Sequence, residues 1–266
     1  METQTDPRLE SFERLLNIMD ELRSGCPWDK KQTFESLRYL TIEETYELSD
    51  AILKGDENEI KKELGDLMLH LVFYSKIGSE KGSFDISDVL NGICEKLIHR
   101  HPHIYANVNV ADDEEVKSNW EKIKLNEKGG NTSVLSGVPK SLPAMVKACR
   151  IQEKARGVGF DWENSNQVFE KVEEELREFK HELAENNTKK IEEEFGDLLF
   201  ALVNFSRFIH INPEDALERT NLKFIKRFSH IEKMAKENNR SIEELSLEEM
   251  DYYWNECKQI SNETTV

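Results

Sequence analysis

The sequence predicts an all-α protein built from two tandem helical-bundle domains that are related by internal duplication. Three observations support this prediction. Apolar residues recur at helical spacing through most of the chain, and no segment alternates with the period of two that marks a strand. Glycine and proline, the residues that interrupt helices, number only 12 and 6 among 266. Finally, one pattern of acidic residues occurs twice with the same internal spacing.

The first half of the chain contains five predicted helices. An apolar stripe over residues 12–22 predicts the first helix, which ends at Gly25-Cys-Pro27. Gly55-Asp56 makes a tight connection between the second and third, which favours an antiparallel pair. Pro102 stops the fourth, and the fifth surrounds Trp120. The second, third and fourth are predicted at about 33–54, 58–77 and 86–101.

A segment rich in helix breakers separates the two halves. Its breakers are Gly129, Gly130, Gly137, Pro139 and Pro143. We therefore predict an N-terminal domain at 1–127, a linker at 128–143 and a C-terminal domain at 144–266. The order of elements then repeats, with a proline at the start of one helix and a capping box at the start of the last. These helices are predicted at about 145–155, 166–185, 189–210 and 213–237, with the last beginning near 246.

The charge and the cysteines limit the classes of partner and compartment. The 53 acids and 36 bases give a net charge of −17, and so acidic a surface repels the backbone of a nucleic-acid polymer. A single nucleotide remains acceptable, because a divalent cation can bridge its phosphates to carboxylates. The four cysteines form no C-x-x-C pair, and we expect reduced thiols in a cytoplasmic protein. With no signal peptide and no apolar span, we expect no membrane association.

The repeated acidic pattern is E-E-x-x-E, a gap of fifteen residues, then E-x-x-D. Each acid of the second copy has a number 131 higher than its counterpart in the first. The first copy is Glu43, Glu44, Glu47, Glu63 and Asp66, and the second is Glu174, Glu175, Glu178, Glu194 and Asp197. Beyond the acids, Lys96-x-x-x-Arg100 matches Lys223-x-x-x-Arg227. Duplication therefore explains the pattern better than chance similarity of two acidic helices.

The spacing of these acids predicts two cation sites. Residues three or four apart share one helix face, so two acids from each helix of an antiparallel pair can meet. Four carboxylates repel one another unless a divalent cation is present, and ligands made only of oxygen select Mg²⁺, Mn²⁺ or Ca²⁺. The predicted ligands are Glu44, Glu47, Glu63 and Asp66 in one site and Glu175, Glu178, Glu194 and Asp197 in the other. Gly65 and Gly196 interrupt these helices at matching places, which close helix approach or ligand access would explain.

Three alternatives stand beside this interpretation. Acidic runs on helices are usually solvated faces. A di-iron centre needs two E-x-x-H motifs, and the sequence around these acids offers only Glu178-x-x-His181. His99, His101 and His103 suggest zinc, but Pro102 breaks the helix between them, so a role at a helix terminus is favoured.

The acidic pattern resembles the signature of MazG-type nucleoside triphosphate pyrophosphohydrolases of the all-α class. Further segments carry the same resemblance: Gly25-Cys-Pro-Trp-Asp-Lys30, Arg100-His-Pro-His103, Val158-Gly-Phe-Asp-Trp162 and Gly196-Asp-Leu-Leu-Phe200. The resemblance implies two MazG-like domains that hydrolyse nucleoside or deoxynucleoside triphosphates, ATP included, to the monophosphate and pyrophosphate. It also implies Mg²⁺, with Mn²⁺ as a substitute, a role in nucleotide-pool house-cleaning, and a homodimer in which helices of both subunits build each site.

The resemblance and the nearby charges also assign roles to single residues. Glu174 or Glu193 would orient or deprotonate the water that attacks the α-phosphorus. The residues expected to act in catalysis are Glu174, Glu175 and Glu193. Those expected to bind substrate are Lys171, Lys190, Glu193, Lys223, Arg227 and Trp254, with Lys96 and Arg100 in the first domain. The alternative for Lys171 is a solvated side chain, and for Trp254 a core aromatic.

The two copies differ in their basic residues. Lys171 and Lys190 of the second copy correspond to Leu40 and Glu59 of the first. We therefore expect the C-terminal domain to be the main catalytic one, while the N-terminal acids still bind metal. The alternative function is a non-catalytic helical protein that binds nucleotides or regulates a partner.

Overall fold

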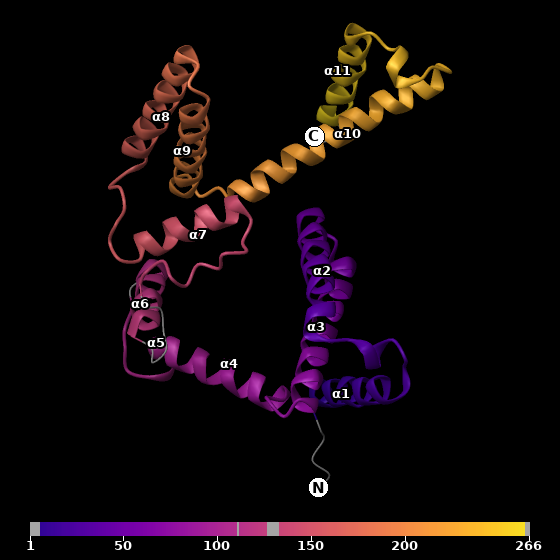
Figure 1. Ribbon diagram of the computed structural model, residues 1–266, viewed down its shortest axis with the longest axis vertical. Coiled ribbons are helices and arrows are strands. Elements are labelled where there is room, and N and C mark those ends of the chain that lie inside the picture. Colours follow the sequence, from indigo (N-terminus) through magenta and orange to yellow (C-terminus); the bar gives the residue numbers. More distant parts are fainter. Residues whose placement is uncertain (1–5, 111, 127–132, 264–266) are drawn as a thin grey trace. The chain divides into compact units, whose positions relative to one another are not determined.

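The computed structural model describes residues 6–110, 112–126 and 133–263, and every regular element among them is a helix (Figure 1). The all-α prediction is therefore confirmed. The chain divides into two compact units, Met1–Ala111 and Asp112–Val266. Helix α6 (Asp113–Asn126) belongs to the second unit, whereas the sequence places these residues in the first domain. Residues 127–132, where that domain ends and the linker begins, lie outside the described residues, so the domain bounds stay predictions.

The first unit is built around a hairpin of two long helices. Its elements are α1 (Pro7–Gly25), η1 (Asp29–Lys31), α2 (Phe34–Lys54), α3 (Glu57–Glu80), α4 (Ile86–Arg100) and α5 (Pro102–Tyr105). Gly55 ends α2 in the left-handed conformation, with φ 69°, which glycine adopts without strain. The carboxylate of Asp56 then accepts hydrogen bonds from the first turn of α3. This two-residue connection sets α2 beside α3, as Figure 1 shows.

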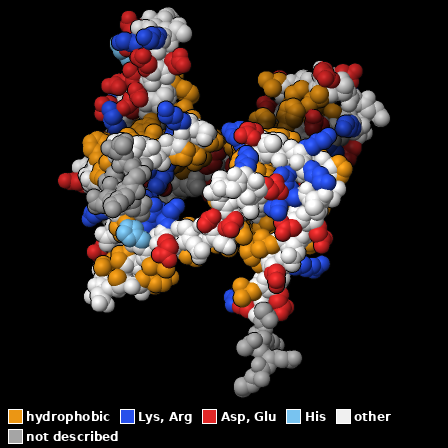
Figure 2. All heavy atoms as spheres, turned by 60° about the horizontal axis from the view of Figure 1, so that its bottom comes forward, with side chains coloured by type: hydrophobic (Ala, Val, Ile, Leu, Met, Phe, Trp, Pro, Cys, Tyr) orange, Lys and Arg blue, Asp and Glu red, His pale blue; other side chains and the backbone are white. Residues whose placement is uncertain are grey.

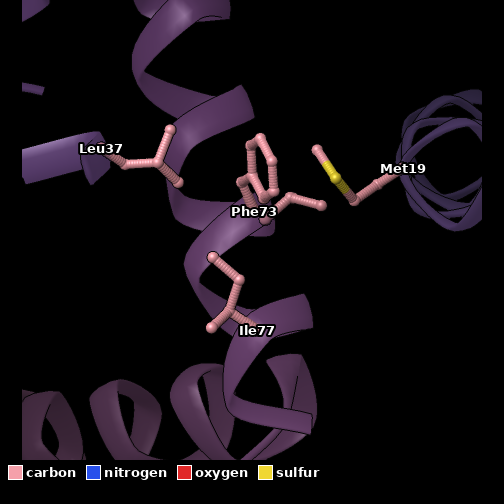
Figure 3. Packing of buried hydrophobic residues seen from close by; sticks show 5 residues of the cluster. Met19, Leu37, Phe73 and Ile77 are labelled. Carbon is pink, nitrogen blue, oxygen red and sulfur yellow. The ribbon is translucent and has the colours of Figure 1, made fainter. Parts of the chain in front are cut away.

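The core of this unit lies where α1 packs on the hairpin. Figure 3 shows Met19 of α1, Leu37 of α2 and Phe73 of α3 directed toward one another, with Ile77 one turn further along α3. These four side chains are almost completely buried together with Val72. Burial of apolar side chains on this scale stabilises the hairpin and fixes which faces of α2 and α3 point inward.

Two features near the ends of α3 and α4 differ from the sequence prediction. Helix α3 continues through Gly78, where a Cβ would lie 2.7 Å from atoms of the Phe84 ring, so the glycine lets Phe84 pack against the helix. Pro102 ends α4 as expected, but it also begins the short helix α5, because a proline loses no hydrogen bond in a first turn. His101 is the residue at this junction, and its Nδ1 lies 2.6 Å from the carbonyl oxygen of Leu97. The predicted helix-terminus role is confirmed for this histidine.

The second unit contains a matching hairpin and a separate helix pair. After α6, its elements are α7 (Ala144–Arg156), α8 (Ser165–Glu185), α9 (Thr188–Phe208), α10 (Pro213–Glu237), η2 (Ile242–Glu244) and α11 (Leu247–Glu263). Asn186 ends α8 with φ 55°, at the position that corresponds to Gly55. Gln152 of α7 attaches that helix to the hairpin by donating a 2.9 Å hydrogen bond to the carbonyl oxygen of Phe200 in α9. Helices α10 and α11 pack on each other around Ile231 and Ala235.

All four cysteines, Cys26, Cys94, Cys149 and Cys257, are free thiols. Among the described residues, no helix is both long enough and apolar enough to cross a membrane.

Candidate metal centres

Each hairpin brings three carboxylates together. In the second unit, Glu175 of α8 meets Glu194 and Asp197 of α9, and one oxygen of each lies within 4.8 Å of the others. In the first unit, Glu44, Glu63 and Asp66 form the same arrangement between α2 and α3. The acids converge because E-x-x-D places two side chains on one face of the second helix, opposite an acid of the first. Corresponding acids of the repeat therefore meet in both hairpins, although the most buried acid is Glu63 in one and Glu175 in the other.

The fourth acid predicted for each site lies outside its group. Glu47 and Glu178 are exposed, one turn beyond Glu44 and Glu175. Their charges still act on the groups, since Glu47 contributes to raising the pKa of Glu44 and Glu178 does the same for Glu194. Three acids are thus assembled by the fold, and the fourth stands beside them.

Burial and mutual repulsion raise the pKa of one carboxyl in each group. Desolvation, and after it the neighbouring carboxylates, raises the pKa of Glu44 above its ordinary value of 4.5. The same two causes raise the pKa of Glu194. A raised carboxyl pKa means that the negative form is disfavoured, as expected where several acids meet without a cation. Binding of a divalent cation would remove this repulsion.

Glu63 gives the clearest indication of a ligand. Its side chain is only 3% exposed, and its Oε2 is buried with no hydrogen-bond donor. Its other oxygen accepts a 2.9 Å hydrogen bond from the ammonium of Lys62. A buried oxygen left without a partner costs roughly 1–3 kcal/mol, and more when it carries charge. A hard cation between the three acids would satisfy this oxygen, so the residues present fit such a ligand.

In both hairpins a lysine contacts the most buried acid of the group. Lys171 places its Nζ 2.7 Å from both Glu174 and Glu175, and these two hydrogen bonds raise the pKa of the lysine. In the first unit the contact comes instead from Lys62, on the other helix of the hairpin. Lys190 lies at the start of α9 and pairs with Glu182 at 3.3 Å. Lys171 is therefore beside the acids, as a substrate-binding role requires.

Glu193 lies on α9 of the hairpin, and the other predicted substrate-binding residues lie on separate helices. In the second unit, Lys223 and Arg227 are on α10, and the guanidinium of Arg227 lies 5.2 Å from the ring centre of Trp254 on α11. Among the described residues, no contact joins these three side chains to the acids of α8 and α9. In the first unit, Lys96 and Arg100 occupy the last turns of α4. The structure thus assembles the acids and Lys171, and it leaves the α10–α11 residues apart from them.

The two helical glycines have open surroundings. A Cβ on Gly65 or Gly196 would meet nothing within 4 Å. Close approach between helices of one chain therefore does not explain these two glycines. Of the two predicted explanations, ligand access is the one that is left.

Sequence reasoning assigned no site role to Arg177, His181 and Glu182, which lie on one side of the C-terminal site. Together with the predicted ligand Glu178 they line a shallow, open hollow next to Glu194. The repeat could have signalled three of these residues, because Tyr46, Asp50 and Ala51 take the places of Arg177, His181 and Glu182 in the first copy. Lys62 was also missed, and its position directly before Glu63 was the available signal.

The fold and the acids define an all-α protein with tandem hairpins, each of which presents oxygen ligands suited to a hard divalent cation. The sequence model of the MazG nucleotide pyrophosphohydrolase domain matches residues 32–105 and 163–232, so each match contains one acid group. The chain belongs to the MazG nucleotide pyrophosphohydrolase family.

Several named relatives and one solved structure are similar to this chain. The nucleoside triphosphate pyrophosphohydrolase/pyrophosphatase MazG of Thermotoga maritima is 44% identical over 93% of this chain and 95% of its own length. The nucleoside triphosphate pyrophosphohydrolase of Escherichia coli K12 is 40% identical over 94% and 98%. YabN of Bacillus subtilis is 48% identical over 93% of this chain and 52% of its own length. The crystal structure of a mazG-related protein from Thermotoga maritima aligns with 42% of this chain and 97% of its own, at 27% identity and a TM-score of 0.38.

Proposed function

We propose that this protein hydrolyses nucleoside and deoxynucleoside triphosphates to the monophosphate and pyrophosphate with Mg²⁺, mainly at the hairpin of α8 and α9. The observation that carries the proposal is the group of Glu175, Glu194 and Asp197, which offers three oxygens within 4.8 Å inside a matched MazG domain. The relatives named as nucleoside triphosphate pyrophosphohydrolases support the reaction. The cellular role that fits is removal of unwanted nucleotides from the pool.

The acids would hold the cation and leave other carboxylates for proton transfer. Mg²⁺ bound by Glu175, Glu194 and Asp197, with Glu178 beside them, supplies Lewis acidity toward the phosphate oxygens. Glu174 and Glu193 each immediately precede a proposed ligand in the sequence. One of them orients or deprotonates the water that attacks the α-phosphorus, and pyrophosphate leaves. Glu174 is engaged by Lys171, whereas Glu193 is exposed on α9.

Cationic side chains would stabilise the charge that develops on the phosphates. Lys171 already lies against Glu174 and Glu175, and it can turn toward a triphosphate once a metal ion neutralises those acids. Lys223 and Arg227 carry further charges on α10. Because they do not contact the acids of their own chain, we propose that a second copy of the chain completes the site.

Exposed apolar stripes support this homodimer. On α9, Phe195, Leu199 and Leu202 follow one another at helical spacing on one face, and Leu64, Met68 and Leu71 occupy the corresponding positions of α3. All six side chains are between 43% and 52% exposed. Figure 2 shows hydrophobic side chains gathered among charged ones at the surface of the chain. Gly65 and Gly196 adjoin these stripes with open space around them, which suits close approach of a helix from a partner.

The experiment that tests the reaction uses the purified full-length protein, Mg²⁺ and a panel of nucleoside and deoxynucleoside triphosphates. Pyrophosphate and orthophosphate are measured separately. We expect pyrophosphate and the monophosphate in equal amounts, and loss of the reaction when EDTA removes the metal. Orthophosphate alone would contradict the cleavage position. Nucleotide binding without either product would favour the alternative of a non-catalytic nucleotide-binding or regulatory protein.

Two further variants separate the candidates for the base. Glu193→Gln and Glu174→Gln keep the shape of each side chain and remove its capacity to take a proton. The variant that loses turnover while keeping its affinity for the nucleotide identifies the base. Equal and small effects of both would contradict a role for either carboxylate.

A further inference from the structure

A polar network joins the two helices of the N-terminal hairpin. The hydroxyl oxygen of Thr41 on α2 lies 2.9 Å from Nδ1 of His70 and 2.6 Å from the phenol oxygen of Tyr74, both on α3. The same hydroxyl donates a 3.0 Å hydrogen bond to the carbonyl oxygen of Leu37. His70 is buried, and Thr41 and Tyr74 are half-buried. One side chain of α2 is thereby fixed to two of α3.

The network lies one helical turn from the N-terminal acids. Thr41 precedes Glu44 by three residues, and His70 follows Asp66 by four, so each shares a helix face with a member of the acid group. Burial lowers the pKa of His70, while the nearby charge of Asp66 acts in the opposite direction. The network and the acids are therefore neighbouring layers of the same helix interface.

One arrangement of hydrogen atoms satisfies every donor of the network. In it, Thr41 gives its one hydroxyl proton to the carbonyl oxygen of Leu37, and its own oxygen accepts from both other members. The phenol of Tyr74 is then a donor, and the neutral ring of His70 carries its proton on Nδ1. Each of these three donors has an acceptor, which is the condition under which a buried network restricts motion rather than costing stability.

The C-terminal hairpin has no such network at the same positions. Val172, Ala201 and Phe205 replace Thr41, His70 and Tyr74 at the constant offset of 131, and Val172 and Ala201 are buried. Both hairpins nevertheless bring one oxygen of each of their three acids within 4.8 Å of the others. The network is therefore not needed to form the helix pair.

We propose that Thr41, His70 and Tyr74 act as a positioning clamp that holds Glu44 and Asp66 ready for a divalent cation, so that the N-terminal hairpin binds its cation without a nucleotide. This inference rests on the proposed cation role of the N-terminal acids. Ligands held in place before binding lose less freedom on binding, and partners behind metal ligands change affinity by about 10- to 100-fold. The unpaired Oε2 of Glu63 lies in the same group and gives the cation an oxygen that no protein donor satisfies.

The test measures Mn²⁺ binding, by calorimetry and by electron paramagnetic resonance, in the full-length chain with its C-terminal acids neutralised by Glu175→Gln and Glu194→Gln. No nucleotide is present. In this background we expect one Mn²⁺ per chain, and we expect Thr41→Val to weaken its binding about 10-fold. His70→Gln, whose amide can still donate to Thr41, should retain most of the affinity, and His70→Leu should not. Val172→Thr, at the matching C-terminal position, is the control and should leave Mn²⁺ binding unchanged.

The outcomes separate this inference from the proposed function. Thermal unfolding of each variant shows that the chain is folded at the temperature of the binding measurement. Unchanged Mn²⁺ affinity in Thr41→Val and His70→Leu, with binding intact in the parent, would overturn the clamp and leave the N-terminal cation site standing. Absence of Mn²⁺ from the parent would overturn the cation role of these acids and the clamp with it.

Discussion

The two hairpins share their acids and differ in the lysine and in the helix layer beside those acids. Glu44, Glu63 and Asp66 form the same constellation as Glu175, Glu194 and Asp197. The nearest ammonium comes from the second helix of the N-terminal hairpin but from the first helix of the C-terminal one. The adjoining layer is polar in the N-terminal hairpin and apolar in the C-terminal one. The ligand set is thus a property of the hairpin, while the use of the site depends on its neighbours.

The difference in lysine position has a direct chemical meaning. Lys171 pairs with Glu174 and Glu175, and in the proposed reaction it turns from these acids toward the triphosphate. The ammonium of Lys62 pairs with Glu63 and lies 3.6 Å from Glu59, so both acids that it contacts belong to its own helix, α3. A site that turns over substrate needs basic side chains that can move to the substrate phosphates. A site that only holds an ion needs only the metal ligands. The following experiments test this distinction.

The largest expected effect is a difference in catalytic activity between variants of the two acid groups. Glu175→Gln should lower pyrophosphate release by more than about 100-fold, because a ligand is lost where the phosphates must be bound. Glu44→Gln is its matched counterpart and should change turnover by less than about 3-fold. Steady-state assays with Mg²⁺ and a triphosphate measure both. Equal losses in the two variants would show that the hairpins work as one catalytic unit.

The next effect concerns the apolar stripes. Leu199→Glu places a charge on the exposed face of α9, and we expect it to weaken dimerisation by about 100-fold or more, since an unpaired charge would have to be buried. Light scattering after size exclusion, over a range of protein concentrations, measures this change. Met68→Glu makes the same change in α3. A parent protein that is monomeric at all concentrations would contradict the proposed dimer.

A smaller effect should distinguish the two lysines. Lys171→Met should lower turnover about 10-fold, since one phosphate-facing cation is lost. The same variant should bind Mn²⁺ a few-fold more tightly at the C-terminal acids, because no ammonium competes for Glu175. Lys62→Met serves as the control for activity and should leave turnover close to that of the parent. If Lys171→Met changed neither quantity, Lys171 would be a solvated side chain that merely pairs with nearby acids.

The smallest effect is the dependence on pH. The pKa values of Glu44 and Glu194 are raised in the folded protein, so without metal their contribution to the free energy of unfolding is complete below the unfolded value near 4.5. That contribution is lost as the pH rises through the raised pKa values. Mn²⁺ binding should show the opposite trend and weaken as the pH falls, because protons compete for the same oxygens. Thermal unfolding and Mn²⁺ titrations between pH 4.5 and 7 measure both trends.

A control identifies the groups behind this pH dependence. Glu44→Gln together with Glu194→Gln should flatten the change in unfolding temperature that occurs without metal. A slope unaffected by these substitutions would assign the dependence to other acids of this highly charged chain.

Much of the fold follows from local sequence. Periodicity and breakers located α2, α3 and α4 to within three residues at each end, because the tight connection at Gly55 and the proline at 102 are local signals. The short helix α5 was not predicted, since a proline marks a helix start as readily as a helix end. Likewise, the extension of α3 past Gly78 depends on Phe84, which returns to pack on that glycine.

The candidate site was predicted less completely than the fold, for a physical reason. The E-x-x-D spacing predicts a shared helix face, and the acids of each hairpin do converge. Spacing does not reveal that Lys171 turns back onto Glu175, or that Thr41 meets two side chains that lie 29 and 33 residues away. Such contacts depend on the rotation of each helix about its axis. The placement of Lys223, Arg227 and Trp254 against the acids stays a prediction.

The two-residue connections at Gly55 and Asn186 have an evolutionary consequence. Glu175 is only 19 and 22 residues from Glu194 and Asp197, so a complete ligand set is encoded within one uninterrupted stretch of chain, Ser165–Phe208. Copying such a stretch copies all the ligands at once, with no need to rebuild contacts between distant segments. Because the pairing of the two helices is local, each copy can also form soon after its synthesis, before the rest of the chain is available. A gene carrying this unit could therefore acquire a second site in a single event and afterwards alter only the residues around it.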